Sequence, residues 1–148
     1  MDRKALKSAH EFKRRLNKHL PKKEFSINYR LEQAEESRLA AEILLKRAKS
    51  FRGAVHFAYS AMFYAALGLL VREGKGSSKH RGVLAMFDRG FVKTGIFPKE
   101  MSKAFQEIFE LKQVGDYKEY AEVKKLDAKK ALQTSREFVN AIKAYLEQ

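Results

Sequence analysis

Residues 111–120, LKQVGDYKEY, gather the side chains in this chain that are best suited to chemistry. Lys112 follows an apolar helical face, and Asp116 lies one helical turn further on, with Tyr117 beside it. An ammonium group, a carboxylate and a phenol within one turn could bind an anion or move a proton. The alternative is an ordinary helix end, in which the lysine extends along apolar surface and places its charge in water. The pattern alone leaves both interpretations open.

Two histidines are further candidates. His56 falls inside the most apolar segment, where a histidine is more often a hydrogen-bonded core or interface residue than a ligand, and we expect that structural role. His80 begins a short predicted helix in the stretch SSKHRGV, where a partly exposed imidazole could meet a phosphate group. A structural role is the alternative for His80.

Several classes of site are absent from the sequence. There is no glycine-rich phosphate loop, no G-x-S-x-G serine elbow and no metal-binding spacing among the four histidines. The absence of cysteine excludes disulfides, thiolate zinc sites and cysteine nucleophiles. The sequence therefore predicts no metal and no cofactor. With no cysteine and no unbroken apolar core near the N-terminus, we expect a cytoplasmic protein.

Helices must position these groups. Only two prolines and eight glycines interrupt a chain of 148 residues rich in helix formers, and apolar residues recur at three- and four-residue steps. The sequence predicts one all-α domain, an up-and-down bundle of four to five helices (26–148) preceded by a basic helical arm (1–25). The expected helices cover residues 1–20, a segment capped by Ser26, 54–71, 79–89, a segment starting at Pro98 and one starting at Asp127.

Residues 54–71 form a charge-free run of 18 residues, the lower edge of membrane-spanning length. Histidine, tyrosine, serine and glycine dilute this run, so we expect no membrane contact. A helix without a polar face belongs in the centre of a bundle or at a dimer interface. Its small residues would let a neighbouring helix approach closely; they are Ala54, Ala58, Ala61, Ala65 and Gly68.

The formal net charge of +13 is large for this length. Residues 1–23 hold nine Lys or Arg against two acidic residues, a net +7, which leaves +6 for the other 125 residues. A basic arm on a mildly basic body favours an anionic partner, and phosphate backbones are the first candidate. A solvated, charged helix without a ligand is the alternative, and binding to a membrane surface is another.

Three strings of the sequence resemble the HEPN superfamily, and in particular its small UPF0332-type proteins. They are AYSAMFYAALGLL, SSKHRGVLAMFDRGFVKTGIFPKE and LKQVGDYKEY, and the resemblance covers roughly residues 27–146. It implies a helical bundle that dimerises, with Tyr59 and Phe63 in the dimer interface. Many HEPN proteins are metal-independent endoribonucleases with an R-x4–6-H motif. Many are encoded beside a small nucleotidyltransferase antitoxin.

The resemblance also implies a site. The arginine position of the motif falls on Lys112 and the histidine position on Tyr117, so Lys112, Asp116 and Tyr117 become the candidate catalytic residues. Lysine keeps the charge but loses the planar fork of arginine, and tyrosine, with an ordinary pKa near 10, is a poor base at neutral pH. We therefore expect weakened ribonuclease activity. The same resemblance assigns nucleotide or RNA binding to Lys79, His80 and Tyr120.

Two hypotheses follow. In the first, the protein is a homodimeric toxin-type HEPN protein that acts on RNA in a groove between protomers. In the second, it is a non-catalytic module that binds nucleotide or RNA, or that docks a nucleotidyltransferase and accepts a nucleotide on Tyr117 or Tyr120. A generic nucleic-acid-binding bundle, driven by the basic arm, is a third alternative.

Overall fold

The computed structural model describes residue 7 and residues 22–77, 79–118 and 121–148. Over these ranges the chain forms five α-helices with no strand, which confirms the predicted all-α class. The helices are α2 (Lys22–Lys46), α3 (Phe51–Arg72), α4 (His80–Phe87), α5 (Lys99–Tyr117) and α6 (Lys125–Leu146), and a short π-helical segment, η1 (Asp88–Val92), follows α4 directly.

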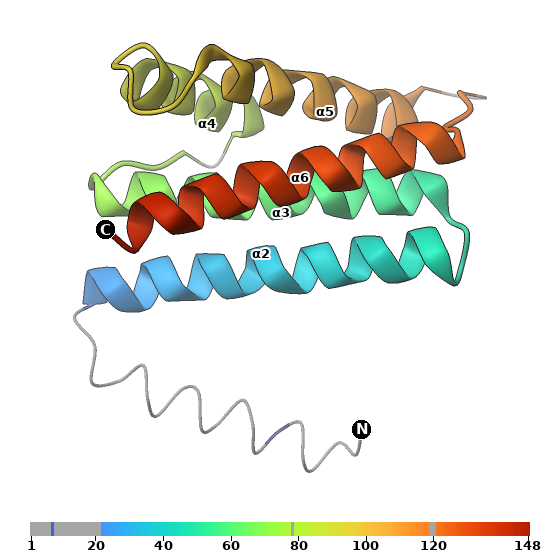
Figure 1. Cartoon of the computed structure of the whole chain (residues 1–148), viewed down its shortest axis with the longest axis horizontal. Helices are drawn as coiled ribbons and strands as arrows, with labels where there is room; N and C mark the ends of the chain where they lie inside the picture. The colour runs from blue at the N-terminus through green and yellow to red at the C-terminus, as the bar shows by residue number, and fades with distance from the viewer. Residues whose placement is uncertain (1–6, 8–21, 78, 119–120) are drawn as a thin grey trace.

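Successive long helices run in opposite directions, so the bundle is up-and-down (Figure 1). Helix α3 lies at its centre and packs against α2, α4, α5 and α6. The predicted basic arm lies almost entirely outside the described residues, except that residues 22–25 form the start of α2. Ser26, predicted to cap this helix, therefore lies inside it.

Small residues allow α3 to occupy the centre. Ala58, Ala61 and Ala65 are fully buried, and a side chain added at Gly68 would place its Cβ 3.4 Å from the Cβ of Arg30 on α2. The buried hydroxyl of Ser135 on α6 donates a 2.7 Å hydrogen bond to the Ala58 carbonyl. Helix α3 is apolar and long enough to cross a membrane, but 67% of its most apolar window is buried inside the bundle. Its apolar composition is that of a core helix.

A cluster of aromatic rings joins α4 and η1 to α5 and α6. Phe87 is fully buried, and its ring centroid lies 5.2 to 6.2 Å from those of four other phenylalanines, at positions Phe91, Phe97, Phe105 and Phe138. Such rings bury large apolar areas and favour tilted or edge contacts. This cluster fixes the position of α4 and α5, whose ends carry the candidate site.

Several helix boundaries differ from the sequence prediction. The expected helix over 79–89 ends at Phe87 as α-helix and continues as the π-helical turn of η1. Helix α6 begins at Lys125, and Asp127 acts within its first turn, where its carboxylate accepts a 3.0 Å hydrogen bond from the Lys124 backbone N–H. Pro98 precedes α5 as its N-cap residue.

Ion pairs hold α2 against α6. Glu35 accepts a 2.6 Å hydrogen bond from Lys143, and Glu42 pairs with Arg136. Burial acts to raise the pKa of Glu35, but the hydrogen bonds from Lys143 and Arg38 outweigh it and lower that pKa. Both of these α2 carboxylates thus bind the neighbouring helix.

Candidate functional site

The facing sides of α3 and α5 bring polar groups together at one place. Helix α3 presents His56, Tyr59 and Phe63 at steps of three and four residues, which places them on one face. Helix α5 presents Phe105, Phe109, Lys112 and Asp116 at comparable steps, so its buried apolar stripe ends in two charged residues. We call His56, Tyr59, His80, Lys112 and Asp116 the α3–α5 cluster.

Asp116 contacts two basic side chains in this cluster. One of its oxygens, Oδ2, lies 2.9 Å from His56 Nδ1 and 3.4 Å from Lys112 Nζ. Because an ionised carboxylate only accepts hydrogen bonds, Nδ1 of His56 carries the proton in this contact and leaves Nε2 to face other groups. The side chain of His56 is 41% exposed and that of Asp116 is 21% exposed, so the pair borders solvent.

Lys112 is held inside the protein. Its side chain is only 8% exposed, and the ammonium group lies 5.9 Å from the ring centre of Tyr59 and 5.4 Å from that of Tyr117. An ammonium group over aromatic faces and beside a carboxylate is stabilised as a charge without full hydration. The alternative of a lysine extending into solvent is therefore wrong for this position.

His80 joins the cluster from the start of α4. Its Nδ1 lies 2.9 Å from the buried hydroxyl of Tyr59, and its ring stacks on Phe63 with centroids 4.3 Å apart. Burial lowers the pKa of His80, and the positive charges of Lys112 and then His56 lower it further. The imidazole of His80 is therefore neutral at pH 7, the form that can accept a proton. Burial also raises the pKa of Tyr59, so its phenol stays protonated.

The predicted site residues fall around this cluster to different degrees. Tyr117 is 75% exposed beside Lys112, and Lys79 is exposed next to His80. Tyr120 lies outside the described residues. Phe63 is half-buried, but Tyr59, predicted at a dimer interface, is 1% exposed and packed within its own chain. Tyr59 therefore offers almost no surface to a second protomer.

His56 is the candidate for which the sequence favours a structural role. The structure shows it part-exposed and hydrogen-bonded to Asp116, a contact that fits a structural role and also a role in the site. The available signal was its spacing from Tyr59 and Phe63, which continues one helical face toward the polar end of α5. Only the packing of α3 on α5 could show that Asp116 lies opposite it.

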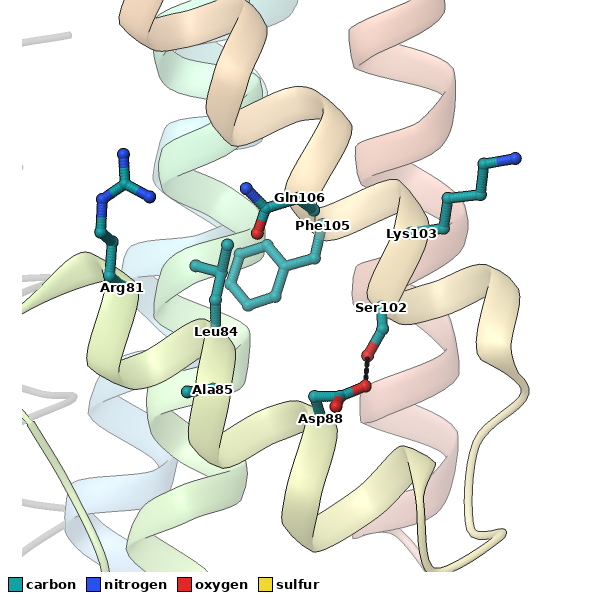
Figure 2. A pocket seen from close by; sticks show the side chains of 8 residues that line it. All are labelled: Arg81, Leu84, Ala85, Asp88, Ser102, Lys103, Phe105 and Gln106. Atoms are coloured by element: carbon teal, nitrogen blue, oxygen red, sulfur yellow. Dashed lines mark hydrogen bonds between the residues drawn. The ribbon is translucent and has the colours of Figure 1, made fainter.

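A groove between α4 and α5 continues from the cluster (Figure 2). Its volume is about 430 Å³, and the guanidinium of Arg81 at one end lies 5.3 Å from the ring centre of Phe109. At the other end Ser102 donates a 2.7 Å hydrogen bond to Asp88, as the dashed line in Figure 2 marks. The groove thus offers a cation next to His80 and an acceptor further away.

The cluster combines groups for acid–base chemistry on an anion. One imidazole is paired with a carboxylate, another is neutral, and a buried ammonium lies near both. Among the residues that the structure describes, no group of three or more His, Cys, Asp or Glu could hold a metal ion. The arrangement fits proton transfer and charge stabilisation by side chains.

Comparison with known proteins gives a consistent result. The family model described as HEPN domain matches residues 27–145. The "UPF0332 protein" of Thermotoga maritima is 38% identical over 125 residues, which cover 84% of this chain and 94% of that protein. "Putative toxin MJ0142" of Methanocaldococcus jannaschii is 34% identical over 116 residues, which cover 78% of each chain. "Putative toxin MJ0605" of the same organism is 36% identical over 87 residues, which cover 59% of this chain and 64% of that protein.

Proposed function

The chain belongs to the HEPN domain family, and we propose that it is the toxin-like member of a toxin–antitoxin pair and acts on RNA through the α3–α5 cluster. Two similar proteins bear the name "Putative toxin", which supports this role. The observation that carries the RNA proposal is the burial of the Lys112 ammonium, which lies 3.4 Å from the same Asp116 oxygen that His56 contacts. Such a group is suited to stabilising the charge of a phosphate.

The α3–α5 cluster supplies the histidine base that the motif loses through tyrosine at position 117. Tyrosine at position 117 is a poor base, but the imidazole of His80 is neutral. When its Nδ1–H donates to the Tyr59 hydroxyl, its Nε2 can accept the proton of a ribose 2′-hydroxyl. His56, oriented by Asp116, donates a proton to the leaving 5′-oxygen. Lys112 balances the additional negative charge on phosphorus. Arg81 and Lys79 extend the positive surface along the RNA.

The proposal includes a homodimer in the cytoplasm and a small nucleotidyltransferase as the antitoxin. The part of α3 that other helices leave uncovered supports the dimer, because it carries large apolar side chains that are only half-buried. These are Phe57, Phe63, Tyr64 and Leu67. Half-exposed aromatic side chains on one helix are typical of protein interfaces. A symmetric contact here would bring both copies of His80 and Phe63 near the twofold axis.

An RNA cleavage assay in EDTA tests the site. Wild-type protein should cleave single-stranded RNA, and Lys112→Met and His56→Gln should each lower the rate about 100-fold or more, since single charge-stabilising and proton-transferring groups contribute about that much. Lys99→Met, on the exposed first turn of the same helix, is the matched control and should retain the wild-type rate. Equal rates for all four proteins would refute the assignment of the site.

The exposure of Tyr117 favours a second candidate function. Its phenol is largely solvent-accessible and its ring lies under the Lys112 ammonium, which would attract a nucleotide phosphate. A nucleotidyltransferase partner could therefore attach a nucleotide to this tyrosine. Mass spectrometry after incubation with that partner and a nucleoside triphosphate should show an adduct on the wild-type protein and none on Tyr117→Phe. An adduct of equal yield on both would exclude Tyr117 as the acceptor.

A further inference from the structure

A second concentration of positive charge lies between α2 and α6, away from the α3–α5 cluster. It is a hollow of about 390 Å³, within the range of about 300–1,000 Å³ typical of small-molecule sites. Five of its eight lining residues are basic and the others are uncharged. We call it the basic hollow; its cations are Lys46, Lys49, Lys125, Lys129 and Arg136.

The cations come from two elements that meet at one end of the bundle. Lys46 ends α2 and Lys49 follows it, while Lys125, Lys129 and Arg136 lie on one face of α6, at steps of four and seven residues. Helix α6 also begins here, and Asp127 in its first turn accepts a hydrogen bond from the Lys124 backbone N–H. The positive charge of the hollow therefore comes from its side chains.

Glu42 is the carboxylate that interacts with cations of the hollow. Arg136 pairs with it, and the hydrogen bond from Arg136 lowers its pKa, to which the charge of Lys46 also contributes. None of the ion pairs within the described ranges involves the four lysines of the hollow. Four ammonium groups around one concavity repel one another, and an anion seated between them would relieve that repulsion.

Other hollows in the structure show that this charge pattern is not simply the high net charge of the chain. The groove between α4 and α5 combines Arg81 and Lys103 with Asp88 (Figure 2). The hollow near the start of α2 contains Glu24 and Glu147 beside its basic residues. Each of these surfaces mixes charge signs, whereas the basic hollow holds one sign only.

Lys49 lies in the turn that ends α2. Its φ angle is +51°, in the left-handed region where a glycine is favoured and a lysine is strained. Within the described part of the chain no other non-glycine residue has a positive φ. Helices commonly end in this conformation, and at the end of α2 the Ser50 backbone N–H donates a 2.8 Å hydrogen bond to the Leu44 carbonyl. The side chain of Lys49 lines the basic hollow.

We propose that the basic hollow binds a ligand carrying two or more phosphate groups. The ammonium groups and Arg136 meet the phosphate oxygens, and Leu45 and Leu132 form an apolar part of the wall. The phosphates belong either to a free nucleoside polyphosphate or to the backbone of RNA. This site is separate from the α3–α5 cluster because it is built from α2 and α6, and it stands whether or not the cluster cleaves RNA.

Binding measurements with a charge-matched control test the proposal. Lys46→Ala/Lys129→Ala removes two cations of the hollow, and Lys99→Ala/Lys130→Ala removes two exposed lysines outside it, one of them the immediate neighbour of Lys129. With inorganic triphosphate as the probe in calorimetry, the first variant should bind about 10- to 100-fold more weakly, since charge-assisted contacts are lost. The second should bind as wild type. Equal weakening in both variants would overturn the proposal.

Parallel probes distinguish the sources of phosphate. If triphosphate and an oligoribonucleotide both bind and compete, the site takes free polyphosphates; if only the oligoribonucleotide binds, it takes the RNA backbone. If only the oligoribonucleotide binds, Lys46→Ala/Lys129→Ala should make the negative slope of log K against log salt shallower by about 1.4, which is about 0.7 for each of two lost phosphate contacts. Polyglutamate that displaces either probe at equal charge concentration would overturn the assignment, because the hollow would then fit an acidic protein.

Lys49→Gly separates binding from stability. The glycine relieves the left-handed strain, so the melting temperature should hold or rise, while triphosphate binding should weaken by about threefold or more with the loss of one charge. A variant that melts normally and binds triphosphate as tightly as wild type would contradict the role of Lys49 in the hollow. Weakened binding in a protein of unchanged stability would support it.

Discussion

Removing Asp116 and removing Lys112 should have unequal effects on stability, although the two residues form one ion pair. Asp116→Asn leaves the Lys112 ammonium, 8% exposed, without a carboxylate. Removing one partner of a buried pair costs about 3–5 kcal/mol, and partial exposure of Asp116 places the expected value near the low end, about 3 kcal/mol. Lys112→Met keeps the apolar stem and leaves Asp116 bonded to His56, so it should cost only about 1 kcal/mol.

The double variant makes this argument quantitative. Once the ammonium is gone, the loss of the carboxylate matters little, so Lys112→Met/Asp116→Asn should cost about 1 kcal/mol, as Lys112→Met alone does. The singles would sum to about 4 kcal/mol, and the coupling energy is therefore about 3 kcal/mol. A simple Coulomb estimate at 3.4 Å and an effective dielectric constant of 20 gives about 5 kcal/mol before desolvation is subtracted.

Urea denaturation at pH 7 measures all four free energies of unfolding, with Lys99→Met as a control that should stay within about 0.5 kcal/mol of wild type. The reasoning fails if Lys112→Met is as destabilising as Asp116→Asn. It also fails if the two costs add in the double variant, because the ammonium and the carboxylate would then be independent of each other.

Three further outcomes are expected. Because the pKa of His80 is lowered on folding, the unfolded chain binds a proton more readily, and stability should decline as pH falls below about 6.5. In melting curves between pH 7 and 5, His80→Gln should flatten that decline. An unchanged dependence of stability on pH would show that another group titrates. Phe87→Ala should cost about 3–5 kcal/mol in urea denaturation because it empties the centre of the aromatic cluster, whereas a cost below about 1 kcal/mol would mean that the cluster collapses around the gap. Ser135→Ala should cost about 1 kcal/mol by the same method, because the hydrogen bond to the Ala58 carbonyl is lost. A gain in stability would indicate that burying the hydroxyl destabilises the protein more than its hydrogen bond stabilises it.

Much of the fold could be predicted from periodicity. The apolar run over 54–71 indicated the central helix, and its small residues indicated close packing, both of which α3 shows. Helix ends were harder to predict. Ser26 has the chemistry of a cap but lies inside α2, because the helix extends back to Lys22, and the π-helical turn after Phe87 has no signature in the local sequence.

The candidate site could be predicted only in part. The spacing of Lys112 and Asp116 indicated that they lie one turn apart on one helix, and in the structure they also form an ion pair. His56 could not be connected to them, because its distance from Asp116 depends on how α3 and α5 pack across 60 residues of chain. Likewise, the contact of His80 with Tyr59 arises from the placement of α4. The basic hollow also depends on packing, because its lysines come from two separate parts of the sequence, residues 46–49 and 125–129.

The chemical ends of RNA fragments test the central claim most directly. If a base near Lys112 activates the ribose 2′-hydroxyl, purified wild-type protein in EDTA should produce fragments with 2′,3′-cyclic phosphate ends and free 5′-hydroxyls, identified by mass spectrometry. His80→Gln should lower their yield by about 100-fold or more. Fragments with 3′-hydroxyl and 5′-phosphate ends, or cyclic ends formed equally well by His80→Gln, would contradict the account.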